Sequence, residues 1–536
     1  MQTSLLHRFF FLLLSLMPSF AGAAPPEIKP GWDWSLPTGT QSVKYSGFVT
    51  WEGQRFDPAI TVSGIHITWA DLNPAPGEYN WKLLSDQIDQ ARQDGMRAGL
   101  HLMGVERSGV PDWVIQKYNP PIIDVPPLQM NQPWHLQIVP PWFSGVDESF
   151  QDFLKAFSTT GIAQKDDVVY GYMHGISPSR GEELFLRNQD VRILENTSGL
   201  TPSVFAEWLR RRTDAMLLGF KGVEYKLAWM APGPVGPNRA YKMATSGLWD
   251  YALGHGTGIR GGAIDFMGSL VDSPAWASTL TPEGYCIVDD ETPTIKEHRY
   301  RGDENEEYGK GSQYRFGTGD EAYRHRICSL RGLQMRQNFQ MVSPATLKLN
   351  PELNAYVLLT QGRTREDSPD AWAYLREAKV GQNRTYKNIE RWLVQRDTPG
   401  SRSVADLPIQ RLGIGNASIQ MQTDFDGRRT NRIEGQDGLA FQIDRVFWPK
   451  PAPATIKVTY TDLMPAQWRL VTTNSQGETI RSGAVENTGD GQQKTATFNV
   501  EELTARGAFP GQMDFRLLCN GPGDLYVSMV RVISLQ

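Results

Sequence analysis

Two adjacent glutamates, Glu182 and Glu183, follow a run of Pro, Gly and Ser residues in the stretch His174–Leu184. Hydrolysis of a glycosidic bond uses two carboxyl groups, one of which protonates the departing oxygen. Apolar and aromatic surroundings keep such an acid protonated near neutral pH. We therefore expect Glu182, with Glu183 as the alternative, to be a general acid. The competing interpretation is a helix N-terminus, where the helix dipole stabilises glutamates; the two interpretations are compatible.

A second acidic stretch, Gly302–Gly309, has four carboxylic residues in five consecutive positions. Glu304 is the preferred candidate for the second catalytic carboxylate, and Glu306 is the alternative. His298 and Tyr300 precede this stretch, where they would hydrogen-bond the carboxylate and keep it ionised. The competing interpretation is a solvated acidic loop or a Ca²⁺ site, because that ion is held by carboxylate oxygens.

The segments between residues 60 and 395 alternate between strand-like and helix-like patterns. Ser63–Thr68 has Ile65 and Ile67 on one face, and a helical pattern follows it after a turn. Further predicted strands are Ala98–Met103, Val168–Met173, Tyr225–Met230, Ile259–Met267 and Thr294–Arg301. Repeated strand–helix units form parallel sheets. Six strands can be named, and about eight over ~330 residues predict a (β/α)8 TIM barrel. Catalytic groups of such barrels stand on the loops that follow the strands, where both acidic stretches fall.

Residues 405–536 show strands and turns only. Ile456–Tyr460, Ala496–Val500 and Leu525–Met529 alternate with period two, and turn signals separate them. This pattern predicts a C-terminal β-sandwich of jelly-roll type. The expected organisation is a signal peptide (1–24), an extension that adds a strand to either domain (25–59), the barrel (60–395), a linker (396–404) and the sandwich (405–536).

The first residues are typical of a secretory signal peptide. Phe9–Met17 is apolar, and Ala21–Ala24 offers small residues for cleavage. The apolar run is shorter than the roughly 20 residues that span a bilayer. We therefore expect a periplasmic or secreted protein with no membrane association after cleavage; the alternative is an uncleaved N-terminal anchor.

The composition narrows the class of partner. A formal net charge of −5 argues against nucleic acid, which requires a basic patch. The 16 Trp and 18 Tyr residues supply aromatic faces for sugar rings, although core packing is expected for most of them. No His and Cys cluster has metal-ligand spacing, and no Gly-rich phosphate loop opens a helix. We expect a poly- or oligosaccharide substrate, no metal and no cofactor; the sequence leaves the oligomeric state open.

One segment resembles a known group of enzymes. Trp69–Pro74 followed by Gly77–Trp81 is similar to the first strand–loop–helix of clan A glycoside hydrolases, above all the family 42 β-galactosidases and the related families 35 and 39. Gly99–Gly104 resembles the second strand of that clan. In the clan, the acid/base follows strand four and the nucleophile follows strand seven. The resemblance therefore implies these roles for Glu182 and Glu304, and it favours a β-galactan-type substrate.

The acid/base segment departs from the clan. Gly181-Glu182 stands where the clan usually has Asn-Glu, and Ser177–Glu182 is more similar to the G-P-x-G-E stretch of β-amylases. Those enzymes invert the anomeric centre, whereas clan A enzymes retain it. Retention is favoured and inversion stays open. The alternative function is a non-catalytic glycan-binding or exopolysaccharide-associated protein with an enzyme-like barrel.

Several residues near predicted strand ends are candidates for contact with sugar, and for each of them a structural role is equally expected. Trp229 is a candidate stacking platform, and Arg260 a candidate partner for an anionic sugar substituent. The full set is Trp69, Asp71, His101, His174, Trp229, Arg260, His298 and Tyr300. In the sandwich, Trp448 and Trp468 are candidates for a binding face, with core packing favoured for Trp468.

Overall fold

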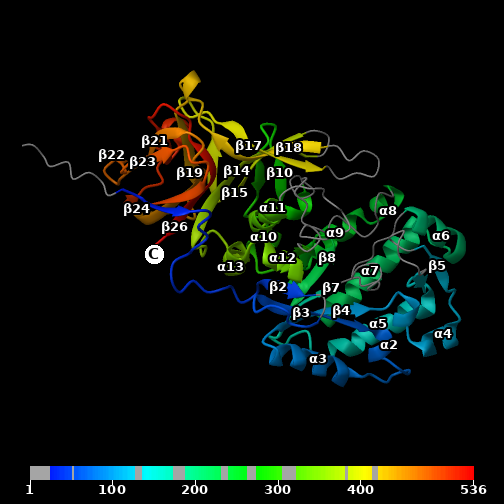
Figure 1. Cartoon of the computed structure of the whole chain (residues 1–536). Helices are drawn as coiled ribbons and strands as arrows, with labels where there is room; N and C mark the ends of the chain where they lie inside the picture. Colours follow the sequence, from blue (N-terminus) through cyan, green and yellow to red (C-terminus); the bar gives the residue numbers. More distant parts are fainter. Residues whose placement is uncertain are drawn as a thin grey trace, which may run out of the picture.

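The computed structural model describes residues 25–50, 53–126, 136–172, 188–230, 239–261, 273–304, 321–380, 384–412 and 421–535. It has a barrel with surrounding helices at one end and antiparallel sheets at the other (Figure 1). The proposed signal peptide lies outside the described residues. No helix among those described is both long enough and apolar enough to cross a bilayer.

Eight parallel strands close a barrel, which confirms the TIM-barrel prediction. Each strand pairs with the next along the chain, and the last pairs with the first. In chain order they are β2 (Gly47–Thr50), β3 (Ile60–Thr68), β4 (Arg97–Met103), β7 (Val168–Tyr172), β8 (Leu227–Met230), β9 (Gly258–Arg260), β12 (Arg301–Glu304) and β13 (Phe339–Met341).

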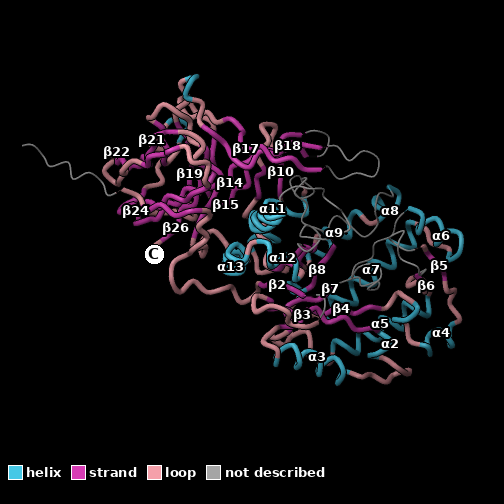
Figure 2. The backbone as a smooth tube through the Cα atoms, in the orientation of Figure 1, coloured by secondary structure: helices cyan, strands magenta, loops and turns pink. Residues whose placement is uncertain are grey.

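Helices follow most of the barrel strands and cover the outside of the barrel (Figure 2). They are α2 (Trp69–Leu72), α3 (Trp81–Gln93), α4 (Asp112–Tyr118), α5 (Ser144–Ser158), α6 (Asn188–Ser198), α7 (Pro202–Gly219), α8 (Arg239–Ala244), α9 (Ser246–Gly254), α10 (Pro293–Lys296), α11 (Glu321–Gln334), α12 (Pro344–Leu349) and α13 (Pro351–Thr360). Two short hairpins interrupt the pattern: β5 (Ile123–Val125) with β6 (Leu136–Ile138), and β10 (Ser278–Leu280) with β11 (Cys286–Val288).

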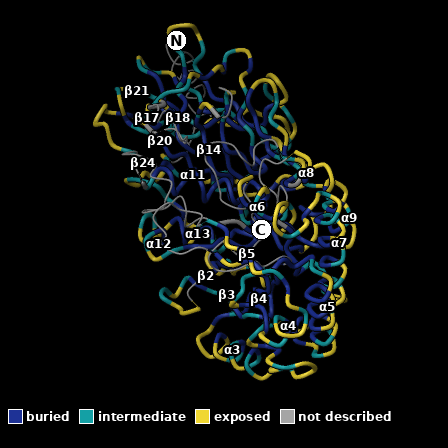
Figure 3. Tube along the Cα trace, turned by 90° about the vertical axis from the view of Figure 1, so that its right-hand side faces the viewer, coloured by how far each residue is buried: buried dark blue, intermediate teal, exposed yellow. Residues whose placement is uncertain are grey.

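The alternation of side chains in β3 explains how the barrel divides its core. Ile65 and Ile67 pack outward into the cluster shared with the helices. Because successive strand residues face opposite sides, His66 lies on the inward face with Val62, which belongs to the separate cluster inside the barrel. Burial is strongest along these strands and falls toward the outer helix faces (Figure 3). β3 is therefore apolar on its outer face and contributes the polar side chain of His66 to the barrel interior.

Gly99 in β4 is required by a close approach inside the barrel. A Cβ atom at this position would lie 2.0 Å from the Tyr170 ring. The missing side chain therefore makes room for Tyr170, whose hydroxyl reaches the His101 ring at 2.8 Å.

The barrel boundaries differ from those expected. β2 lies in the segment predicted as an extension, so the strand that resembles the first strand of clan A is the second barrel strand. The predicted strand Thr294–Arg301 is replaced by α10 and a turn, with the strand itself at Arg301–Glu304. The Pro-rich stretch 126–141 contributes β6 to a hairpin outside the barrel.

The C-terminal part is a two-sheet antiparallel structure, as predicted. One sheet has the order β1-β24-β20-β26-β14-β18-β17 with β15 on β14, and the other has the order β16-β19-β25-β21-β22 with β23 on β21. Their bounds are β1 (Glu27–Pro30), β14 (Asp370–Val380), β15 (Arg384–Arg391), β16 (Leu393–Arg396), β17 (Val404–Leu412), β18 (Met421–Arg429), β19 (Gly438–Ile443), β20 (Ala452–Thr461), β21 (Pro465–Thr473), β22 (Thr479–Arg481), β23 (Val485–Thr488), β24 (Gln493–Leu503), β25 (Phe515–Cys519) and β26 (Tyr526–Ser534).

The sandwich begins earlier than the sequence suggests. β14, β15 and most of β16 precede residue 396, inside the stretch 60–395 assigned to the barrel. The N-terminal extension was expected to add a strand to either domain. It adds one to each, because β1 joins the sandwich and β2 joins the barrel. Trp448 and Trp468 are both buried in the sandwich core, and their indole N–H groups donate to Leu503 and Asn487. Both residues therefore pack, and neither presents an exposed binding face.

Helices α11 and α13 lie between the barrel and the sandwich (Figure 1). Tyr323 and Ile327 of α11 share one apolar cluster with Trp372 and Tyr374 of β14. Three buried ion pairs, Arg326–Asp426, Arg376–Asp424 and Arg531–Asp370, lie in this region. We call it the barrel–sandwich junction.

Candidate active site

Two barrel strands adjoin the acidic stretches along the chain. β7 is the fourth barrel strand and β12 the seventh. Four predicted site residues lie outside the described residues: His174, Glu182 and Glu183, which follow β7 in the chain, and Glu306, which follows β12. Glu304 is the last residue of β12, and its backbone pairs with Met341 of β13. The carboxyl ends of parallel barrel strands meet at one face.

The described barrel strands contain few carboxylic residues. Asp303 and Glu304 are the only ones in the eight strands, and both stand at the carboxyl end of β12. A carboxylic pair at this end of a strand is therefore a distinguishing feature of the barrel.

The barrel interior holds a polar layer that includes one predicted site residue, His101. This residue is fully buried, and its Nε2 atom lies 2.8 Å from the Tyr170 hydroxyl. The His66 ring is 4.4 Å away, edge to face. Burial lowers the pKa of His66 to about 4. Burial, with the neighbouring His66 and Arg260, also holds the pKa of His101 well below its usual value. Both rings are neutral near pH 7.

Arg260 extends the same layer from β9. Its guanidinium lies 4.7 Å from the centre of the Tyr172 ring, a cation–π contact. The Tyr172 hydroxyl is 3.1 Å from that of Tyr300, which approaches from the residue before β12. Arg260 is 2 % exposed, and its backbone is in register with Gly302. The described part of the interior is thus a continuous set of rings and hydroxyls, to which Arg260 adds a permanent positive charge.

Three of the predicted contact residues lie outside this polar layer. Trp69 is buried in the outer cluster, where its indole donates to Asn73 at 3.1 Å and its ring meets Phe150 edge to face. Asp71 forms a capping box with Thr68 at the start of α2. Trp229 is 1 % exposed and belongs to the outer cluster with the helices. These three residues therefore have the structural role that was the alternative to sugar contact: core packing for the two tryptophans and helix capping for Asp71.

His298 and Tyr300 precede β12, so they lie toward the end of the barrel where its strands begin. His298 is exposed on the surface there. Tyr300 is buried, and its ring stacks on Phe339 with centroids 4.9 Å apart. The sequence predicted both residues within the strand Thr294–Arg301, whereas β12 begins only at Arg301, after both of them. Tyr300 reaches the polar layer only through its hydroxyl.

Sequence reasoning missed His66, Tyr170 and Tyr172 as parts of this layer. The signal was present in β3, where Ile65 and Ile67 alternate with His66. In β7 the same period-two pattern sets Tyr170 and Tyr172 on one face. These residues give the interior hydrogen-bonding capacity but no carboxylate. Among the described residues, no group of His, Cys, Asp and Glu has the arrangement of a metal site.

The comparisons with known proteins give distant likenesses only. No family model matches the chain, and no curated protein matches it. Among solved structures, an exo-β-1,4-mannosidase from Opitutaceae bacterium strain TAV5 is 13% identical, with a TM-score of 0.26 over 56% of this chain and 44% of that one. A β-galactosidase from Halorubrum lacusprofundi is 11% identical, with a TM-score of 0.23 over 42% of this chain and 38% of that one.

A third structure, an α-galactosidase from Geobacillus stearothermophilus, is 9% identical, with a TM-score of 0.30 over 94% of this chain and 57% of that one. The chain spans less than half the length of the first two. Likenesses this weak do not assign a family, so the functional argument rests on the barrel itself.

Proposed function

We propose that this protein is an exported glycoside hydrolase that cleaves β-glycosidic bonds in a poly- or oligosaccharide. The observation that carries the proposal is the position of Asp303 and Glu304 at the carboxyl end of the seventh strand. They are the only carboxylic residues within the barrel strands as the structure describes them. A nucleophile at this end of a barrel strand meets a substrate bound across the loops of the same face. Glu304 is the proposed nucleophile, with Glu306 as the alternative.

The general acid comes from the segment after the fourth strand. Glu182, with Glu183 as its alternative, donates a proton to the departing oxygen and then removes one from water. Glu304 attacks the anomeric carbon, and the glycosyl-enzyme bond is broken by that water with net retention. A β-galactan-type substrate and cleavage of a signal peptide before Pro25 complete the proposal.

The described surroundings of Glu304 support an ionised nucleophile. Arg260 is in register with Gly302, two residues before Glu304, so a permanent positive charge stands on the neighbouring strand. A nearby positive charge favours the ionised form of a carboxyl group.

Hydrolysis of a glycan panel by matched variants tests the assignment. We expect Glu182→Gln to lower kcat by about 10²- to 10⁴-fold, the range of general acid–base catalysis, and Glu304→Gln to lower it at least as much. Glu183→Gln and Asp303→Asn are the controls, because each changes the carboxyl group next to a proposed catalytic one. Full activity in both Glu182→Gln and Glu304→Gln would overturn the site. Binding of glycans by the wild type without hydrolysis would favour the non-catalytic alternative.

A further inference from the structure

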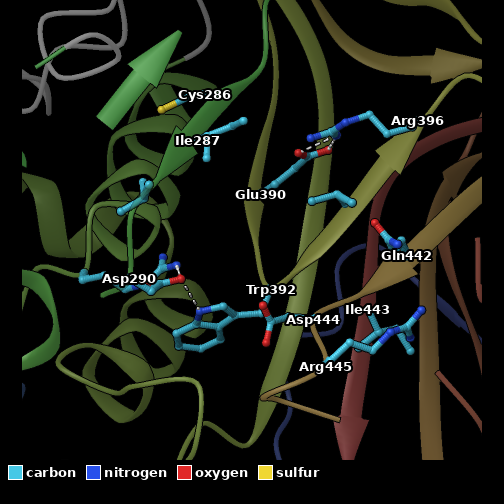
Figure 4. Close-up of a pocket in the computed structure, with 13 residues that line it drawn as sticks. Cys286, Ile287, Asp290, Glu390, Trp392, Arg396, Gln442, Ile443, Asp444 and Arg445 are labelled. Carbon is cyan, nitrogen blue, oxygen red and sulfur yellow. Dashed lines mark hydrogen bonds and ion pairs between the residues drawn. The ribbon is translucent and has the colours of Figure 1, made fainter. Parts of the chain in front are cut away.

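A pocket of about 330 Å³ lies between the β10–β11 hairpin and the sandwich (Figure 4). Its walls are formed by Ile287 of β11, by Trp392 and Arg396 at β16, and by residues 442–445 at the end of β19. This volume is within the range of small-molecule sites. The pocket is therefore large enough for a single sugar ring.

The pocket is remote from the proposed catalytic face. Asp290 and Arg336 line its barrel side and bind each other at 2.6 Å. Arg336 precedes β13, and its carbonyl accepts a hydrogen bond from the side chain of Arg301, the first residue of β12. The pocket thus borders the end at which the barrel strands begin, and a ligand there cannot be the one cleaved at the opposite end.

The charged residues that line the pocket are compensated. Glu390 is paired with Arg396 at 2.8 Å, and Asp290 with Arg336. Arg445 is paired with Asp514 at 2.9 Å, and Asp444 faces Arg365 at 3.7 Å. Because the positive and negative charges balance, the site has no net field to attract a free anion or cation.

The same residues leave hydrogen-bonding capacity toward the pocket. The described hydrogen bonds of Arg396 and Arg445 all use Nη1, whereas a guanidinium carries five N–H donors. The guanidinium of Arg396 also lies 3.8 Å from the centre of the Tyr285 ring. The amide nitrogen of Gln442 donates to the Gln512 carbonyl, so its amide oxygen is available as an acceptor. Donors and acceptors therefore face the same small volume.

An apolar wall completes the pocket. Ile287 is 54% exposed, unusual for an isoleucine on a strand, and Figure 4 shows it near the Glu390–Arg396 pair. Val394 of β16 also lines the pocket. A ligand that fits must present an apolar face to these side chains and hydroxyls to the polar wall.

We propose that this pocket is a second carbohydrate site, which binds one neutral sugar ring of a glycan. Neutral sugars match each observation: hydroxyls donate and accept, one ring face is apolar, and there is no charge to compensate. The site holds glycan without cleaving it. The proposal does not depend on catalysis at the barrel mouth.

Methyl NMR of protein labelled at the isoleucine δ1 carbons tests the site locally. The Ile287 signal is assigned by its loss in Ile287→Val, and the protein is titrated with D-galactose, D-glucose, D-mannose and, separately, sodium sulfate. We expect a saturable shift of the Ile287 signal with at least one sugar and none with sulfate. Gln442→Ala, which removes the amide acceptor, should raise the Kd about tenfold.

Ile480 of β22 is the matched control. β22 forms the opposite edge of the sheet that contains β16, and the side chain of Ile480 is 43% exposed. Its signal should not move. A Glu304→Gln variant that is inactive yet gives the same Ile287 titration separates this site from the catalytic one. The proposal is overturned if no sugar shifts Ile287, if sulfate alone shifts it, or if Ile480 responds equally.

Discussion

The barrel interior and the barrel–sandwich junction bury polar groups in opposite ways. Apart from Arg260, the described polar groups of the interior are neutral partners, such as His101 with Tyr170 at 2.8 Å. The junction holds full charges in pairs, such as Arg531 with Asp370 at 2.8 Å, both with side chains exposed by 3 % or less. Breaking a buried ion pair leaves one charge without its partner, whereas losing one neutral hydrogen bond costs much less. We therefore expect the junction to determine whether the two domains stay together. We expect the interior to set the polar surroundings at the carboxyl end of the barrel strands.

The largest effect is expected at the junction. Asp370→Ala removes the acceptor of Arg531 and of the Tyr356 hydroxyl, so the free energy of unfolding should fall by about 3–5 kcal/mol. Urea denaturation measures it. The control Asp86→Ala breaks an exposed pair with Lys82 and should change stability by less than about 1 kcal/mol. Equal effects of the two variants would contradict the comparison.

The barrel interior should respond to acid. The pKa of His66 is about 4 in the folded state, below its usual value of 6.5. The unfolded chain therefore takes up the proton first, and stability falls as pH decreases from about 6.5 to about 4, by at most about 1.4 kcal/mol per pH unit for this group. Unfolding free energies at pH 6.5, 5.5 and 4.5 should decline less steeply in His66→Gln than in the wild type. Parallel curves would show that His66 does not contribute.

A smaller effect is expected from the hydroxyl contact between strands. Tyr172→Phe removes the hydroxyl that lies 3.1 Å from the Tyr300 hydroxyl and 3.6 Å from Met341 Sδ, and it keeps the ring beneath Arg260. Loss of such a buried neutral hydrogen-bonding group costs about 1 kcal/mol, measurable by thermal unfolding. A loss as large as that of Asp370→Ala would remove the distinction between the two regions.

The smallest effect separates capping from catalysis at Asp71. Asp71→Asn weakens the capping box with Thr68, which should cost up to about 1 kcal/mol of stability. Because the carboxylate is occupied by the cap, kcat should not change. A large fall in kcat with unchanged stability would instead support the predicted contact between Asp71 and the substrate.

The elements that the sequence predicted best are long or strongly patterned. β3 and α3 follow clear periods of two and 3.6 residues. β2 and β13 have four and three residues, too few for a periodic pattern, so one was assigned to an extension and the other was not recognised. β14 was assigned to the barrel because its 11 residues precede the apparent linker. Its pairing with β18 and β26 shows that it belongs to the sandwich.

The candidate site was predictable to the level of strand ends. The sequence predicted a strand at Thr294–Arg301 with Glu304 shortly after it. The strand lies several residues later, so that Glu304 is the last residue of β12. The roles of Trp69 and Trp229 were not predictable, because both an outward-packing and a sugar-facing tryptophan occur at strand ends. The resemblance to clan A stays an expectation, as does the retaining mechanism that it implies.

The most direct test of the central claim is to trap the glycosyl-enzyme. A 2-deoxy-2-fluoro-β-galactoside with an activated leaving group slows breakdown of the covalent intermediate, and peptide mass spectrometry then locates the sugar. We expect the adduct on the peptide that contains Glu304, with none formed by Glu304→Gln. An adduct on another carboxylate, or turnover of the corresponding unfluorinated glycoside with no adduct at all, would contradict the assignment of Glu304 as the nucleophile.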